Sequence, residues 1–138
     1  MIISRASTFI YVKHTNFIDS KLVMDKLPQF RNVTFPDGGT FEGFTDPHTG
    51  GANGFGICTF IDGSTYDGNW VQGIMEGIGT ITFGTSSPSF HHYTGDWKGN
   101  KFEGVGSLVY RYEAKYEGQF KAGKMDGYGR RSLPDKTV

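Results

Sequence analysis

Short runs of alternating aromatic and polar residues recur along the chain, and residues 66 to 70 show the pattern most clearly. Alternation in a strand places Tyr66, Gly68 and Trp70 on one face. It places Asp67 and Asn69 on the other face. The period of two residues predicts a β-strand with one aromatic side and one polar side.

A second apolar alternation follows each Gly-x-Gly sequence and predicts a second strand. The residues expected to share a face are Cys58 with Phe60, Ile81 with Phe83, and Leu108 with Tyr110. In the last stretch Arg131 precedes Leu133, which suits a terminal unit whose outer face no later unit covers. Links such as residues 61–64, with the dipeptide Asp62-Gly63, favour tight turns between strands.

These paired strands belong to an internal repeat. Three copies with identical internal spacing run over residues 66–79, 93–106 and 116–129. An earlier copy starts at Phe41, has Thr45 where the others have Trp or Phe, and carries two extra residues. The starts at 41, 66, 93 and 116 fit a basic period of 23 with insertions at residues 46–52 and 84–92. Such a period indicates a stacked array rather than a globular enzyme core.

The unit resembles the MORN (membrane occupation and recognition nexus) repeat, which reads approximately Tyr-x-Gly-x-Trp-x-x-Gly-x-x-x-Gly-x-Gly. The resemblance covers residues 41 to 133, about two thirds of the chain. It implies that each unit is a β-hairpin and that the hairpins join edge to edge into one twisted sheet with an aromatic groove. We therefore expect an all-β fold, an elongated single-sheet array of hairpins with an irregular or short-helical N-terminal extension.

The repeat suggests a division of the chain into an extension (residues 1–30), the array (31–133) and a C-terminal tail (134–138). Within the array, residues 31–40 form a half unit, in which residues 31–35 are the orphan second strand of a degenerate zeroth unit. Residues 16–27 can form a short helix that ends at Pro28, and a flexible tail is the alternative. The extension would cap the first hairpin or dock to a partner; a targeting segment is a further alternative, because residues 1–18 include Arg5 and Lys13 but no acidic residue.

Recurrent glycines are expected to be structural. They are Gly68, Gly77, Gly79, Gly95, Gly104, Gly106, Gly118, Gly127 and Gly129. Gly68, Gly95 and Gly118 lie between two aromatic residues of one face, where a side chain would hold a ring away from the sheet. A phosphate-binding loop at Gly77 to Gly79 is disfavoured, because that loop needs a following helix and residues 80–83 are strand-like.

Composition and charge agree with this interpretation and limit the partners. Gly accounts for 21 of 138 residues and aromatics for 15%. The 14 basic and 14 acidic residues are segregated, with six acidic and no basic residues in 35–90. Nucleic-acid binding is disfavoured because no concentrated basic face is evident. The basic cluster that suits an anionic membrane comprises Lys121, Lys124, Arg130 and Arg131. A solvated terminal cap is the alternative role of these residues.

No constellation of catalytic residues is evident in the sequence. Cys58 lies at an inward strand position, excludes an intramolecular disulfide and suits a reducing compartment. His91 and His92 are adjacent and should point to opposite faces of a strand, so joint metal binding is not expected. One carboxylate precedes each Gly-x-Gly (Glu76, Glu103, Asp126), which suggests turn chemistry rather than an acid–base pair. We expect no cofactor, metal or small-molecule substrate.

The sequence therefore predicts a non-enzymatic scaffold or docking subunit that binds protein partners through an aromatic groove and the sheet ends. The groove candidates are Phe41, Tyr66, Trp70, Tyr93, Trp97, Tyr116 and Phe120. Packing of these rings against one another is the alternative. The resemblance implies a multisubunit assembly, ciliary, axonemal or cytoskeletal, in the cytoplasm. The rival function is a peripheral membrane module that binds anionic phospholipid, weakly, through the basic C-terminal edge.

Overall fold

The computed structural model describes residues 20–135, which form a short helix followed by one antiparallel sheet. The sheet contains nine strands in chain order, each paired with its sequence neighbours. The helix is α2 (Ser20–Met24), and the strands are β1 (Gln29–Thr34), β2 (Thr40–Thr45), β3 (Ala52–Thr59), β4 (Thr65–Val71), β5 (Ile74–Thr82), β6 (Phe90–Lys98), β7 (Lys101–Tyr110), β8 (Lys115–Lys121) and β9 (Lys124–Ser132). The expected all-β single-sheet array is confirmed.

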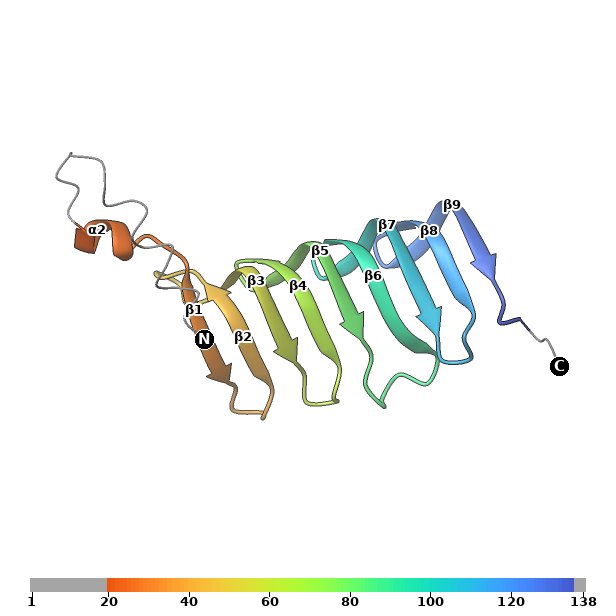
Figure 1. Ribbon diagram of the computed structural model, residues 1–138, viewed down its shortest axis with the longest axis horizontal. Helices are drawn as coiled ribbons and strands as arrows, with labels where there is room; N and C mark the ends of the chain where they lie inside the picture. The colour runs from red at the N-terminus through yellow and green to blue at the C-terminus, as the bar shows by residue number, and fades with distance from the viewer. Residues whose placement is uncertain (1–19, 136–138) are drawn as a thin grey trace.

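The strands form an elongated row in which each strand pairs through its backbone only with its sequence neighbours (Figure 1). No second layer covers either face along residues 29–132. Stability in such an array is a sum of contacts within units and between adjacent units. The functional surfaces of the array must therefore be found on its two faces and at its two edge strands.

The described part of the N-terminal extension contains one helical stretch. Helix α2 (Ser20–Met24) lies inside the predicted helix of residues 16–27, whose first four residues are outside the described range. Strand β1 then pairs with β2 along its full length, with Val33 opposite Phe41. It starts two residues before the expected 31–35 and ends at Thr34, because the next residues form the turn closed by the Phe35 amide bonding the Gly39 carbonyl (2.8 Å).

The burial of strand β4 follows the predicted alternation. Tyr66, Gly68 and Trp70 are buried, and Asp67 and Asn69 are exposed. A register shift between Gly68 and Trp70 recurs at the same place in β2, β6 and β8, so every hairpin carries a bulge. Bulges bend strands, and the hairpin ends accordingly fold over in Figure 1. The bend separates an inner aromatic face from an outer face.

The second strands match the predicted burial only in part. Cys58 and Leu108 are buried, whereas Ile81, Phe83 and Tyr110 are half-buried. Phe60, expected to share a face with Cys58, is exposed. It lies beyond the end of β3 in the turn where its amide bonds the Ser64 carbonyl (2.8 Å), which places its ring at the rim.

Candidate functional site: the aromatic face

The inner face is built from aromatic rings that meet edge to face. Trp97 packs against Tyr93 of its own unit (5.4 Å between ring centroids) and against Tyr66 of the preceding unit (5.1 Å). Trp70 contacts Tyr66 (4.9 Å) and Phe41 (5.7 Å) in the same way. Each of these T-shaped contacts is a favoured aromatic geometry. The rings therefore connect successive units into one core.

Polar atoms of the buried rings are hydrogen-bonded to the backbone. The Tyr66 hydroxyl donates to the Asn69 carbonyl (2.9 Å), and Tyr93 donates to the Asp96 carbonyl (2.8 Å). Trp70 Nε1 donates to the Gly56 carbonyl (3.1 Å). Burial, together with the nearby Asp67 carboxylate, raises the pKa of Tyr66 to about 12. Burial likewise raises the pKa of Tyr93 above its ordinary value.

The recurrent glycines make room for these rings. A Cβ added at Gly79 would collide with the ring of Tyr66, and Gly106 stands in the same relation to Tyr93. Gly129 stands in that relation to Tyr116, while Gly68, Gly95 and Gly118 face the backbone of the partner strand's glycine. A third group lies at the bulges with φ of +88°, +59° and +89° (Gly77, Gly104 and Gly127). Both close approach and positive φ thus require glycine here.

The structure brings all seven predicted groove residues together, but as a packed core. Their exposed fractions run from 0% for Tyr66 and Tyr93 to 8% for Tyr116. The others, at 4% to 7%, are Phe41, Trp70, Trp97 and Phe120. Their atoms are used in contacts within and between units, so a partner would meet only the rims of most rings.

One place on this face departs from the rule followed elsewhere. Directly opposite each large ring of a first strand lies a large residue of the second strand: Trp70 opposite Met75, Trp97 opposite Phe102 and Phe120 opposite Met125. In the first unit the corresponding pair is Thr45 opposite Ala52. A hollow of about 450 Å³ opens at this position, lined by both residues and by Phe41, Cys58 and Trp70.

The inserted loop of residues 46–51 forms a wall of this hollow through Gly50 and Gly51. Asp46 accepts hydrogen bonds from the backbone amides of His48 and Thr49 (both 2.8 Å) and from the side-chain Nε2 of Gln72 (3.0 Å). These bonds, chiefly those from Thr49 and Gln72, lower the pKa of Asp46 to about 2. The loop is therefore tied both to itself and to the next unit.

Two of the three carboxylates that precede a Gly-x-Gly sequence, Glu76 and Glu103, bond to the turn of the following unit. Glu76 accepts a hydrogen bond from the Gly99 amide (2.9 Å), and Glu103 accepts one from the Ala122 amide (3.0 Å). Asp126 occupies the same position in β9, beyond which no further strand is described. These groups cap backbone donors across units.

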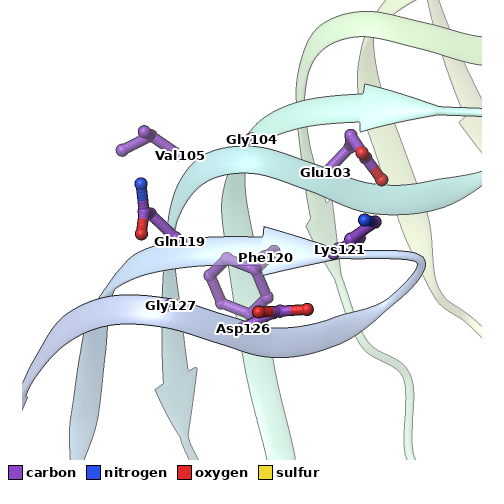
Figure 2. Close-up of a pocket in the computed structure, with 8 residues that line it drawn as sticks. All are labelled: Glu103, Gly104, Val105, Gln119, Phe120, Lys121, Asp126 and Gly127. Carbon is purple, nitrogen blue, oxygen red and sulfur yellow. The ribbon is translucent and has the colours of Figure 1, made fainter.

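The predicted lipid-facing residues are exposed but do not form a uniform patch. Lys121 and Lys124 face each other at the end of the last hairpin, and Arg130 lies opposite Glu117. A shallow hollow of about 380 Å³ beside them is lined by Glu103, Phe120, Lys121 and Asp126, among others (Figure 2). Two carboxylates thus lie among the cations of this edge.

The histidine pair does not adopt the expected arrangement. His91 and His92 were expected on opposite faces, but their Nδ1 atoms lie 2.7 Å apart. A register shift between Phe90 and His92 turns the two rings toward each other. Burial, with the charges of His91 and Lys115, lowers the pKa of His92. Within residues 20–135 no group of three or more potential ligands is arranged to hold a metal.

Comparison with known proteins identifies the family. The model of the MORN repeat matches residues 50–65, 66–87, 93–111 and 116–138, more than half of the chain. The chain belongs to the MORN repeat family. Alsin of Homo sapiens and Alsin of Pan troglodytes are similar, each 29% identical over 111 residues. That match covers 80% of this chain and 6% of the relative, so the chain spans a small part of the length of these proteins.

MORN repeats commonly mediate protein or membrane interactions and are generally non-catalytic. In the described residues no helix is long and apolar enough to cross a bilayer. The MORN units of this chain differ from one another mainly at the Thr45–Ala52 pair and in the inserted loops. Thr45 was predicted as a departure from the repeat, whereas its pairing with Ala52 was not. The signal available was the run of large residues at Met75, Phe102 and Met125, against which Ala52 is small.

Proposed function

We propose that this MORN array is a non-enzymatic docking element that holds protein partners along its sheet. The observation that carries the proposal is a row of exposed apolar side chains on the outer face. The middle residue of each Gly-x-Gly forms the row: Phe55 (49% exposed), Ile78 (64%), Val105 (63%) and Tyr128 (88%). From the alternation of residues in the strands, this outer face was predicted to be polar. An exposed apolar row along one face is typical of a protein contact surface.

The row lies on the outside of the bend. Figure 2 shows Val105 and Gln119 projecting from the bent strands away from Glu103 and Lys121. Polar residues alternate with the row, since Phe55 lies opposite Asn69, Ile78 opposite Asp96 and Val105 opposite Gln119. A partner would therefore meet one apolar and one polar residue per unit. Because this pair of residues recurs in each unit, the outer face suits a protein partner whose own contacts repeat at the same spacing better than it suits a small ligand.

The cellular setting that we propose is a multisubunit ciliary, axonemal or cytoskeletal assembly in the cytoplasm. This part rests on the resemblance to MORN proteins alone. The division into an N-terminal extension, an array over residues 31–133 and a tail is likewise a proposal, supported by the start of β1 at Gln29 and the end of β9 at Ser132. The inner rings of the terminal units, such as Phe41 and Phe120, are proposed secondary contacts.

The experiment is affinity capture of the tagged full chain with quantitative mass spectrometry, compared across two variants. Ile78→Lys and Val105→Lys together disrupt the outer row without touching the ring core. Thr80→Lys and Ser107→Lys add the same charge to the same strands beside the row. The proposal requires a defined protein set that the first variant loses and the second retains. Retention of that set by both variants, or capture of no protein, would contradict it.

A further inference from the structure

We propose that the hollow beside Thr45 and Ala52 is a receptor for an aromatic side chain of a partner polypeptide, with Lys or Arg next to that residue in the partner. This inference rests on the proposed docking function and assigns it a second contact on the inner face. The aromatic nature of the partner residue is inferred from the large aromatic and apolar residues that occupy the equivalent positions in the other units of the array.

The first argument is the occupancy of the equivalent positions. In the other units the cross-strand pair is Trp with Met, Trp with Phe or Phe with Met, and its first-strand ring is buried. Trp97, for example, contacts Tyr66, Tyr93 and Phe102 at centroid distances of 5.0 to 5.4 Å. Replacement by Thr45 and Ala52 removes an aromatic ring and a long apolar chain from one point of a continuous core.

The second argument is the apolar lining of the hollow. The largely buried rings of Phe41 (4% exposed) and Trp70 (7% exposed) present only their rims to the hollow, and Val33, Ala52 and Cys58 complete its apolar lining. Its volume of about 450 Å³ lies in the range of ligand-binding pockets. An aromatic side chain can form the same edge-to-face contacts with Phe41 and Trp70 that the rings of other units form.

The third argument is that the wall is held in place. The loop of residues 46–51 carries the hydrogen bonds of Asp46 described above, and the Thr49 hydroxyl bonds Gln72 Oε1 (2.9 Å). Its far end is fixed where the Gly73 amide donates to the Ala52 carbonyl (2.8 Å). A preformed wall lowers the entropy lost when a side chain enters.

The fourth argument is charge. Residues 35–90 hold six carboxylates and no Lys or Arg. Asp37 lines the hollow, and its charge, after burial, contributes to the raised pKa of the Cys58 thiol. Of the six, Asp37 is the one among the residues that line the hollow, and the nearby Arg31 of β1 donates to Gln29. A cation beside the inserted aromatic residue would pair with the Asp37 carboxylate, which favours basic over acidic partners.

The test is a titration of the full chain, labelled with ¹⁵N, with three capped tripeptides: acetyl-Lys-Trp-Lys-amide, acetyl-Lys-Ala-Lys-amide and acetyl-Glu-Trp-Glu-amide. We expect saturable shifts of the Ala52 and Cys58 amides and of the Trp70 indole with the first peptide. The other two should bind at least about tenfold more weakly. Equal binding of the Trp and Ala peptides would overturn the aromatic receptor. Free indole that binds as well as the first peptide would overturn its assignment to polypeptides.

A filling variant provides the structural control. Thr45→Trp with Ala52→Met restores the pair found elsewhere and should lower binding of the first peptide at least about tenfold. Thr45 is itself buried (1% exposed) and its hydroxyl donates to the Gln29 carbonyl (3.0 Å), so a thermal melt must show that the double variant is folded. If the double variant does not fold, Ala52→Met alone fills part of the space and should still weaken binding. Undiminished binding by a folded filling variant would refute the site.

The outcomes separate this inference from the docking function. If the chain binds the Trp peptide at the hollow but captures no protein, the receptor is supported and the proposed docking function is contradicted. If the chain fails to bind the peptide, and captures proteins equally well with and without the filled hollow, the docking function is supported and the receptor is contradicted.

Discussion

The indole Nε1 of Trp97 donates a hydrogen bond to the carbonyl of Gly79, 3.0 Å away in the preceding unit. Trp70 makes the equivalent bond to Gly56 at 3.1 Å. The same ring thus joins two units by a polar contact and by ring packing. Because each unit lacks a core of its own, such junctions determine whether the array unfolds as one body or in parts.

Trp97→Ala should destabilise the array by about 3–5 kcal/mol, the usual cost of removing a buried aromatic ring. Trp97 is 4% exposed and contacts Tyr66, Tyr93 and Phe102. Trp97→Phe keeps a ring, as Phe120 does naturally, but loses the bond to Gly79 (about 0.5–1.5 kcal/mol) and part of the indole packing, so it should cost less than Trp97→Ala. Urea denaturation followed by circular dichroism measures both. Equal costs would show that ring packing does not dominate.

Gly79→Ala should be far more harmful than Gly73→Ala. A Cβ at Gly79 would collide with the ring of Tyr66, which has no free space on its other side because Tyr66 is fully buried. At Gly73 a Cβ meets nothing within 4 Å, and only the positive φ of +80° opposes it. The Gly73 variant should lose about 1 kcal/mol. Thermal melts of the two variants test this, and the melting temperature of Gly79→Ala should be the lower one. Similar melting temperatures would contradict the role of Gly79 as a ring spacer.

The repeat made most of the fold predictable from the sequence. Spacing and alternation placed Tyr66, Trp70, Tyr93 and Trp97 on one face, because identical spacing in consecutive units leaves one consistent register. The Thr45–Ala52 pair was not predicted, since the inserted loop between the two residues obscures which one faces the other. The contact between His91 and His92 was missed for a similar reason. A register shift changes the face that a residue occupies, and alternation alone does not reveal it.

The outer row shows where simple alternation is insufficient. Ile78 and Val105 were visible in each Gly-x-Gly, but period-two counting from Asp67 and Asn69 assigned that face to polar residues. Both are more than 60% exposed. The glycines that flank them serve the rings on the inner face, so the middle residue is free of core packing.

High pH should destabilise the array through its buried phenols. The folded pKa of Tyr66 is raised to about 12 from an ordinary value of 10, chiefly by burial, and Tyr93 is shifted in the same direction. A raised pKa contributes stability below pH 10 that is lost as the pH rises through 12. Melting temperatures should therefore fall steeply from pH 10 upward. Tyr66→Phe should make that fall shallower, and an unchanged slope would contradict the assignment.

Low pH should release the inserted loop before it affects the core. The folded pKa of Asp46 is depressed to about 2 from 3.8, so its contribution is present above pH 4 and is lost as the pH falls toward 2. The amide resonances of His48 and Thr49, which donate to Asp46, should shift over that range. Asp46→Asn should abolish the transition. Resonances that stay constant down to pH 2 would show that the loop is held by other contacts.

The isolated chain should not be retained on vesicles that contain phosphatidylserine or phosphoinositide at physiological ionic strength. Each basic residue near such a surface contributes about 1 kcal/mol, and salt screens the attraction. The four candidates are Lys121, Lys124, Arg130 and Arg131. Arg130 already lies opposite Glu117, and Asp126 lies among them. Co-sedimentation that is lost when these four become Gln would favour the membrane-binding function over docking.

The carboxylates that precede each Gly-x-Gly sequence should contribute to stability only where a turn of the next unit donates a hydrogen bond to them. Glu103 caps the Ala122 amide of the next turn at 3.0 Å, and Glu76 caps Gly99 at 2.9 Å. Glu103→Ala should therefore cost about 0.5–1.5 kcal/mol, the worth of an exposed hydrogen bond. Glu103→Gln keeps an acceptor oxygen and should cost less.

Asp126→Ala is the matched control for Glu103→Ala, because the described array ends at the strand that carries Asp126 and no later turn receives its carboxylate. Its loss should leave the free energy of unfolding within about 0.5 kcal/mol of the unmodified chain, as expected for a surface substitution. Urea denaturation of the three variants measures the order. If Asp126→Ala costs as much as Glu103→Ala, these carboxylates act within their own turns, and the capping between units described for Glu76 and Glu103 does not contribute to stability.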